Sequence, residues 1–235
     1  MKVGIIGAME KEIALLKEGM IIKDTKEVAS LMFYKGELEG HDVIIVKSGI
    51  GKVNAAMCTQ ILIDQFQVSM VINTGVAGAL HHDLEIGDIV VSTDTMQHDI
   101  DASIFGDPKG TIPGMPISIF NADEKLLAVI DEILKENKYK NIYKGRILTG
   151  DQAIGNNEIK KELYQGFKGY CVEMEGGAIA HVCHLNGIPF LIIRAISDKA
   201  DEEVEMNYMQ FLEMAAKKSS DLLKNILSKV TNVIS

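Results

Sequence analysis

Ile188-Pro189-Phe190-Leu191-Ile192-Ile193 is an apolar run that leads directly into Arg194-Ala195-Ile196-Ser197-Asp198. A run this apolar predicts a central strand that is buried on both faces. Arginine, serine and aspartate at its carboxyl end would be costly to bury without partners. In open α/β sheets, ligands bind outside the carboxyl ends of the strands. We therefore expect the functional site at this strand end, with Asp198 as the leading proton donor.

The rest of the chain alternates between strand and helix patterns. Short apolar or alternating runs predict strands at residues 2–7, 31–38, 42–48, 68–73, 88–92, 144–148, 170–174 and 188–196. Apolar stripes predict helices at about residues 9–17, 49–66 and 174–185. Two more helices are predicted, one with Asn121 as its N-cap residue and one from residue 207. This alternation indicates an α/β fold with a mostly parallel sheet, and a hairpin turn at Glu39-Gly40 adds antiparallel strands.

The composition is that of one globular domain spanning residues 1–235. The chain is 47% hydrophobic and 24% charged, and it is long enough to bury a sizeable core. Its net charge of −9 and its lack of a basic stripe argue against nucleic acid as a partner. No run reaches the roughly 18 apolar residues that span a bilayer, and the amino terminus does not read as a signal peptide. Together with three cysteines that form no CxxC pair, these features predict a soluble, cytoplasmic protein with no membrane partner.

Two further strand ends carry acids. Gly7-Ala8-Met9 leads into a helix whose first turns contain Glu12, which on its own fits a solvated acid favoured by the helix dipole. A second strand ends in Glu173-Met174-Glu175, and two glycines follow it. The two glutamates would share a face if the strand continues and would diverge if a helix begins at Met174. The alternative without a function is a pair of acids at a helix N-terminus.

Glycine-rich segments are candidates for ligand contact. Gly49-Ile50-Gly51-Lys52-Val53 is not a phosphate loop, because Val46 and Val53 stand where that loop needs glycine and serine or threonine. Residues 73–79 follow a buried strand, and their glycines either let the backbone approach a ligand or make a tight strand-to-helix turn. Residues 98–116 form a long loop, and long loops in compact domains are often functional.

Histidines are the candidates for metal ligands. His181 and His184 are close together on a predicted helix, but no third ligand of suitable spacing accompanies them. His81 and His82 lie in a polar turn, where we expect them to be solvated. We therefore expect no metal site.

Six short segments form a pattern that runs along nearly the whole chain. They are Gly4-Ile5-Ile6-Gly7-Ala8-Met9-Glu10-Lys11-Glu12, Ser48-Gly49-Ile50-Gly51-Lys52-Val53, Asn73-Thr74-Gly75, Gly150-Asp151, Val172-Glu173-Met174-Glu175 and Arg194-Ala195-Ile196-Ser197-Asp198. In this order they resemble the 5′-methylthioadenosine/S-adenosylhomocysteine nucleosidases, within the nucleoside phosphorylase superfamily. Each segment alone is weak, but all six in order are specific.

The resemblance implies a three-layer α/β/α sandwich with a mixed, mostly parallel central sheet. It implies hydrolysis of the bond between adenine N9 and a 5′-thio-substituted ribose, as in methionine salvage, without a cofactor or metal. Asp198 would protonate adenine N7, Ser197 would hold Asp198, Glu12 would deprotonate the attacking water, and Glu175 would bind the ribose hydroxyls. The other substrate-binding residues that the resemblance implies are Ala8, Met9, Ile50, Val76, Gly78, Ala153, Ile154, Glu173, Met174, Arg194 and Tyr208.

The resemblance also implies a homodimer. Phe105 and Pro113, from the long loop, would reach the 5′-alkylthio pocket of the neighbouring subunit. Some positions depart from the family pattern: Ala153 stands where many relatives have phenylalanine, Val76 replaces a frequent serine, and Asp107 stands where an aromatic residue is often found. These departures concern affinity and substrate range more than the type of reaction.

Three other functions stay open at this point. A nucleoside phosphorylase of the same superfamily needs cations or free amides for phosphate, but Met9, Glu10 and Glu12 stand where such enzymes place arginine. A non-catalytic nucleoside-binding protein would have no need of an acid–base pair. A hydrolase of another adenine nucleoside, such as aminodeoxyfutalosine, fits the small Ala153 and the charged Asp107.

Overall fold

The computed structural model describes residues 1–136 and 141–234. The strands are β1 (Lys2–Gly7), β2 (Ile21–Val28), β3 (Leu31–Leu38), β4 (His41–Lys47), β5 (Met70–Ala79), β6 (Ile89–Gln97), β7 (Ile119–Asn121), β8 (Ile142–Thr149), β9 (Cys171–Glu173) and β10 (Phe190–Asp198). The helices are α1 (Glu10–Gly19), α2 (Lys52–Phe66), the short 3-10 helix η1 (Ser103–Phe105), α3 (Glu124–Lys135), α4 (Asn157–Phe167), α5 (Gly176–Asn186) and α6 (Val204–Ile234).

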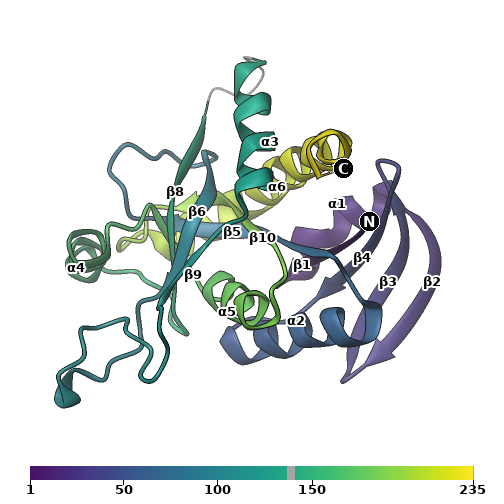
Figure 1. Ribbon diagram of the computed structural model, residues 1–235. Coiled ribbons are helices and arrows are strands. Elements are labelled where there is room, and N and C mark those ends of the chain that lie inside the picture. The colour runs from purple at the N-terminus through teal and green to yellow at the C-terminus, as the bar shows by residue number, and fades with distance from the viewer. Residues whose placement is uncertain (137–140, 235) are drawn as a thin grey trace.

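The described strands form one mixed sheet in the order β10-β6-β8-β9-β5-β1-β4-β3-β2, with β7 beside β6. Strand β10 also pairs with β5, so β5, β9, β8, β6 and β10 close into a ring. Helices α1, α3 and α6 pack together on one face of the sheet, and α2 and α5 pack on the other (Figure 1). The predicted three-layer α/β/α fold with a mixed sheet is confirmed.

Strand β10 is buried along its whole length, as its apolar sequence predicts. It runs parallel to β5 on one side and antiparallel to β6 on the other. Its polar end is buried as well, because Arg194 is 1% exposed and Asp198 is 5% exposed. Charged groups this deep in the protein need partners, and these partners lie around a cavity described below.

Some predicted boundaries were wrong. Residues 73–79 do not turn into a helix but continue strand β5 to Ala79. Helix α6 begins at Val204 rather than at residue 207, and α2 begins at Lys52 rather than at residue 49. Asp123, not Asn121, caps α3, since its side chain accepts a hydrogen bond from the Leu126 amide.

Strand β2 and helix α4 were not predicted. Strand β2 is solvent-exposed along nearly its whole length and lies at the edge of the sheet, so its sequence carries no buried face. In helix α4, Leu163 is buried and Tyr164 and Phe167 pack in the same cluster, so their helical spacing is a signal that sequence reasoning missed. Strand β2 is defined by its hairpin with β3, whereas α4 begins with a local signal, since the Asn156 side chain caps it.

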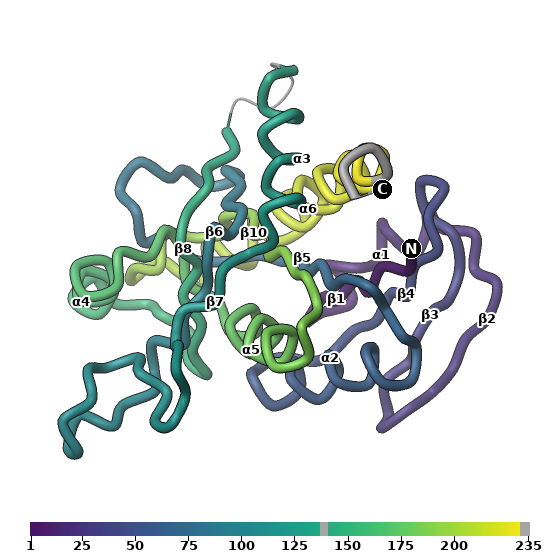
Figure 2. Tube along the Cα trace, in the orientation of Figure 1, coloured from purple at the N-terminus to yellow at the C-terminus, as the bar shows by residue number. Residues whose placement is uncertain are grey.

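The segment between β6 and β7 projects from the body of the molecule at the lower left of Figure 2. It carries η1, and Phe105 at the end of η1 is 86% exposed. Elsewhere, the three cysteines are buried and unbridged. Among the described residues, no helix has the length and apolar character to cross a bilayer.

Candidate active site

A cavity of about 600 Å³ opens beside the carboxyl ends of β5, β9 and β10 and the start of α1. Its size suits a small-molecule ligand. The predicted site residues that line it are Ala8, Met9, Glu12, Ile50, Val76, Gly78, Ala153, Ile154, Glu173, Met174, Glu175, Ser197, Asp198 and Tyr208. The structure thus gathers residues from distant parts of the sequence around one space.

Three predicted site residues do not line this cavity. Arg194 lies buried behind it and contacts the glutamates of its wall. Phe105 and Pro113 are both exposed, on the projecting loop. Their prediction concerned a neighbouring subunit, and it stays a prediction.

Sequence reasoning missed several lining residues, which are Ala77, Gln152, Val172, Val204, Glu205 and Met209. Glu205 and Val204 lie three and four positions before Tyr208 on α6, so helical spacing could have indicated them. Tyr208 reaches across to α1, where its hydroxyl donates a hydrogen bond to the Met9 sulfur at 3.0 Å. The first turns of α6 therefore form one wall of the cavity.

Asp198 is held as an acid with two fixed partners. The Ser197 hydroxyl donates to its Oδ2 at 2.8 Å, and the Ala200 amide donates to its Oδ1 at 2.9 Å. Burial raises the pKa of Asp198 above its ordinary value, although both hydrogen bonds act in the opposite direction. Position 78 has to be glycine, because a Cβ there would lie 2.7 Å from Oδ1 of Asp198.

Glu12 is buried, so the interpretation as a solvated helix acid was wrong. It is 3% exposed, and its carboxylate accepts hydrogen bonds from the amides of Ala8 at 2.7 Å, Met9 at 2.9 Å and Val76 at 3.1 Å. Burial raises its pKa, against the lowering effects of Arg194 and the three amides. Glu12 thus lines the cavity with a carboxylate that backbone amides hold in place.

Position 75 also needs glycine. A Cβ there would lie 2.6 Å from Oε1 of Glu12 and 2.9 Å from Nη1 of Arg194. The glycines of residues 73–79 therefore allow the close approach of the Glu12, Arg194 and Asp198 side chains to the backbone of β5 and do not form a turn.

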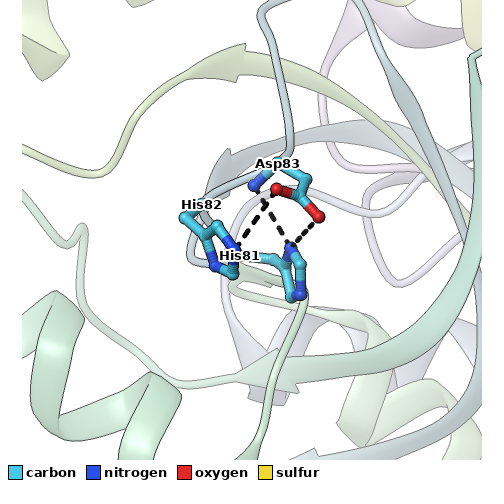
Figure 3. A group of neighbouring side chains, drawn as sticks. All are labelled: His81, His82 and Asp83. Carbon is cyan, nitrogen blue, oxygen red and sulfur yellow. Dashed lines mark hydrogen bonds and ion pairs between the residues drawn. The ribbon is translucent and has the colours of Figure 1, made fainter.

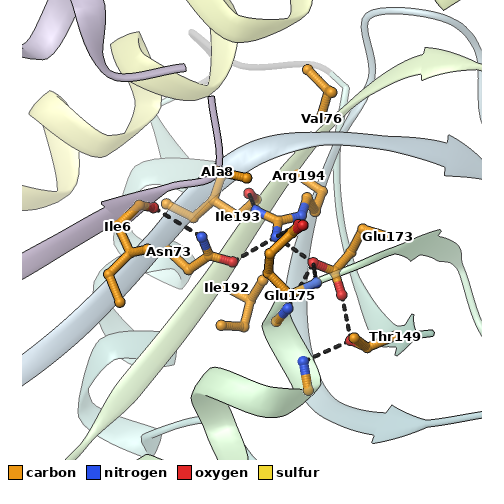
Figure 4. A network of polar contacts seen from close by, with 12 residues as sticks. Ile6, Ala8, Asn73, Val76, Thr149, Glu173, Glu175, Ile192, Ile193 and Arg194 are labelled. Atoms are coloured by element: carbon orange, nitrogen blue, oxygen red, sulfur yellow. Dashed lines mark hydrogen bonds and ion pairs between the residues drawn. The ribbon is translucent and has the colours of Figure 1, made fainter. Parts of the chain in front are cut away.

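A buried polar network lies behind the cavity (Figure 4). The Arg194 guanidinium donates to Oδ1 of Asn73 at 2.6 Å and to the Glu173 carboxylate. Glu173 also accepts hydrogen bonds from the Thr149 hydroxyl and from the Gly176 amide at 2.7 Å. With these partners Glu173 fixes Arg194 and the start of α5.

The carboxylates of Glu173 and Glu175 do not diverge, since both lie near Nη2 of Arg194 and both residues line the cavity. Strand β9 ends at Glu173, and the N-cap residue of helix α5 is Glu175. Its carboxylate accepts a hydrogen bond from the Gly51 amide at 2.8 Å and lies 3.7 Å from Nη2 of Arg194. Burial and the neighbouring Glu173 raise its pKa to about 7, although Arg194 and the Gly51 amide lower it. The two glycines after Glu175 do not leave open space, since a Cβ at position 177 would lie 2.9 Å from the Thr149 hydroxyl.

One group of described side chains could offer three ligand atoms to a cation, namely His81, His82 and Asp83 (Figure 3). His81 is not simply solvated, since its ring stacks on His82 and on Tyr170 and its Nδ1 accepts the Asp83 amide at 3.2 Å. The group lies on the segment after β5, outside the cavity lining.

Comparisons with known proteins show the family of this chain. Residues 2–228 match the model of the phosphorylase superfamily. The chain is 42% identical to a 5′-methylthioadenosine/S-adenosylhomocysteine nucleosidase of Bacillus cytotoxicus, over 98% of this chain and 100% of that protein.

Solved structures of the same fold are similar to the whole chain. A nucleosidase of this kind from Colwellia psychrerythraea, in complex with adenine, is 42% identical with a TM-score of 0.91, covering 98% of this chain and 96% of that one. A futalosine hydrolase of Helicobacter pylori is 37% identical with a TM-score of 0.93, covering 97% of this chain and 98% of that one.

Proposed function

Because the chain belongs to the 5′-methylthioadenosine/S-adenosylhomocysteine nucleosidase family of the phosphorylase superfamily, we propose that it hydrolyses these two nucleosides. The bond between adenine N9 and C1′ of the ribose breaks, and adenine and the 5-thio-substituted ribose are released. The observation that carries this proposal is that one cavity brings together two buried carboxyl groups, Asp198 and Glu12, with different fixed partners.

Asp198 acts as the general acid. Its raised pKa favours the protonated form nearer neutral pH, and the protonated carboxyl donates to adenine N7. The electron pair of the N9–C1′ bond then moves into the adenine ring, and the base leaves as neutral adenine. Ser197 fixes the rotation of the carboxyl group.

Glu12 and Glu175 act at the ribose. As the bond breaks, positive charge develops on the ribose ring, and both carboxylates stabilise it. Glu12 takes one proton from a water molecule, and the resulting hydroxide bonds to C1′. Glu175 accepts hydrogen bonds from the ribose hydroxyls, and Arg194 behind it holds its charge in place.

The hydrogen bonds of Glu12 favour water over phosphate as the nucleophile. A phosphorylase needs free amides or cations near C1′ to bind phosphate. Here the amides of Ala8, Met9 and Val76 donate to the Glu12 carboxylate, whose negative charge repels an anion. This arrangement supports a hydrolase.

The test is adenine release from 5′-methylthioadenosine, first in phosphate-free buffer and then with phosphate added. Release without phosphate, with free methylthioribose as the other product, is the expected result. Release that depends strictly on phosphate would make the protein a phosphorylase and would remove Glu12 from its role as base.

A second candidate is hydrolysis of another adenine nucleoside, such as aminodeoxyfutalosine. It is favoured by the likeness to a futalosine hydrolase and by Ala153, whose small side chain lines the cavity. The same adenine-release assay with that nucleoside decides between the two substrates. A non-catalytic binding protein is disfavoured, because it would not need a buried acid and a buried base in one cavity.

The homodimer is part of this proposal. Phe105 is 86% exposed and Ile104 is 87% exposed on a loop that projects from the subunit, as a segment that reaches a neighbour would be. Phe105 and Pro113 would complete the 5′-alkylthio pocket of the second subunit. A cytoplasmic location and a role in methionine salvage complete the proposal, and the buried, unbridged cysteines fit a reducing compartment.

A further inference from the structure

Three charged residues form a closed set of contacts next to the cavity wall. Asp99 follows β6, Lys52 is the first residue of α2, and Asp151 follows β8. The Lys52 ammonium donates to Oδ1 of Asp99 at 2.6 Å, and the Asp151 amide donates to Oδ2 of Asp99 at 2.9 Å. The Lys52 amide in turn donates to Oδ1 of Asp151 at 2.8 Å. We call Asp99, Lys52 and Asp151 the clamp.

The clamp fixes the start of α2, which carries the amide that holds Glu175. Gly51, the residue before Lys52, donates its amide to Oε1 of Glu175 at 2.8 Å. Gly51 has φ of 96° and a Cβ there would lie 3.1 Å from the Asp151 carboxylate, so the clamp packs directly against this turn. The direction of the Gly51 N–H therefore depends on where the clamp places α2.

Asp99 has the properties of a fixed anchor and not of a surface ion pair. The side chains of Lys52 and Asp99 are 19% and 17% exposed. Burial raises the pKa of Asp99, but the hydrogen bonds from Lys52 and from the Asp151 amide outweigh burial and lower it. An ionised carboxylate with two charge-assisted or amide donors gives short, directional contacts.

We propose that Asp99 is a positioning residue for the ribose-binding carboxylate, because it ties Lys52 and Asp151 together and so holds the Gly51 amide on Glu175. No clamp residue lines the cavity, so the clamp acts on the substrate only through Glu175. The inference rests on the proposed nucleosidase function and extends it to residues outside the cavity.

The expected consequence is a change in the ionisation of Glu175. The Gly51 amide stabilises the ionised form, so loss of that hydrogen bond raises the pKa of Glu175. Activity needs the ionised form of Glu175. The decline of activity on the acid side of the pH profile therefore moves to higher pH. The other ionisable groups that face Glu175 are Glu12, Glu173, Arg194 and Tyr208, none of which the clamp contacts.

The test compares the pH profile of kcat/KM for 5′-methylthioadenosine in the wild type, Asp99→Ala and Asp99→Asn. Asp99→Ala is expected to lower kcat/KM by about 10-fold to 100-fold, mainly through kcat, and to move the acid limb to higher pH. Asp99→Asn keeps an acceptor for the Asp151 amide and is expected to recover part of the loss. The control is Asp131→Ala, which breaks the exposed pair of Asp131 with Lys144 on α3 and β8 and should stay within about 2-fold of the wild type.

Two further measurements test the role of the clamp independently of Asp99→Ala. Lys52→Met breaks the clamp from its other side and should give the same shift of the acid limb if Asp99→Ala does not fold. The NMR signal of the Gly51 amide, followed against pH, reports the ionisation of Glu175 without any turnover. An unchanged acid limb and an unchanged Gly51 titration in a folded clamp variant would overturn the inference. An inactive wild type would overturn the proposed function instead, and the Gly51 titration would still decide on the clamp.

Discussion

The Ser197 hydroxyl donates a hydrogen bond to Oδ2 of Asp198 at 2.8 Å, at the end of a strand that is buried along its whole length. The apolar part of this strand thus packs in the core, and its last two residues line the cavity. Burial favours the protonated carboxyl, whereas the hydroxyl favours the carboxylate. Together with the Ala200 amide, which also favours the carboxylate, these effects set the pH range in which Asp198 can donate a proton.

Asp198→Asn should abolish proton donation to the leaving base while it keeps the shape of the cavity. We expect kcat to fall by at least about 10²-fold to 10⁴-fold, the contribution typical of a positioned general acid. Calorimetric binding of 5′-methylthioadenosine should change little. Turnover near that of the wild type would remove Asp198 from the role of acid.

Ser197→Ala should shift the basic limb of the pH profile. The hydroxyl stabilises the ionised form of Asp198, so its removal raises the pKa of Asp198 further. Because Asp198 acts when protonated, activity should persist to higher pH, while kcat at its optimum falls by about 10-fold for lack of orientation. A basic limb that stays in place would mean that this hydrogen bond does not govern the ionisation of the acid.

Gly78→Ala should damage catalysis through a single added methyl group. Its Cβ would lie 2.7 Å from Oδ1 of Asp198, so the carboxyl has to move, at a cost of about 1–3 kcal/mol in the free energy of unfolding. Gly166→Ala in α4 is the matched control, since no atom lies within 4 Å of the added group. Chemical denaturation and kcat should separate the two variants, and equal behaviour would contradict the close packing at residue 78.

Glu175→Gln should make stability less dependent on pH. The pKa of Glu175 is raised from 4.5 to about 7 in the folded protein, so the folded state binds this proton more tightly than the unfolded chain does. This contribution is fully present below about pH 4.5 and is lost as the pH rises through about 7, at about 1.4 kcal/mol per pKa unit.

The melting temperature of the wild type should therefore drop between pH 5 and pH 7.5 by more than that of Glu175→Gln. Exposed Glu213→Gln serves as the control, because its side chain is 80% exposed. A wild type and a Glu175→Gln variant with the same pH dependence would be the contrary result.

Phe105→Ala should raise KM for 5′-methylthioadenosine by about 10-fold, since it removes an aromatic ring from the neighbouring subunit's 5′-alkylthio pocket. Exposed Ile159→Ala, on α4, is the control for loss of a surface apolar side chain. Unchanged kinetics for Phe105→Ala would contradict a pocket shared between subunits.

Local sequence was enough to predict the elements whose own residues show a pattern of apolar and polar positions. The apolar run of β10 and its polar end predicted both a buried strand and the place of Asp198 at the cavity, because apolar and charged residues follow one another within eleven residues. Strand β2 has no buried face, so only its pairing with β3 defines it.

The environment of Glu12 was beyond local reasoning. Its position in the first turn of a helix predicts exposure, but β5 and Arg194 close over it from segments far along the chain. The clamp was invisible for the same reason, because Lys52, Asp99 and Asp151 belong to three separate segments. The motif resemblance supplied Glu12 where periodicity could not.

The most direct test of the central claim is the identity of the nucleophile. 5′-Methylthioadenosine is incubated with the protein in ¹⁸O-labelled water that also contains phosphate, and the sugar product is examined by mass spectrometry. We expect free methylthioribose with one ¹⁸O atom introduced at C1, because Glu12 activates water and repels phosphate. A methylthioribose 1-phosphate without label from the solvent would contradict this expectation.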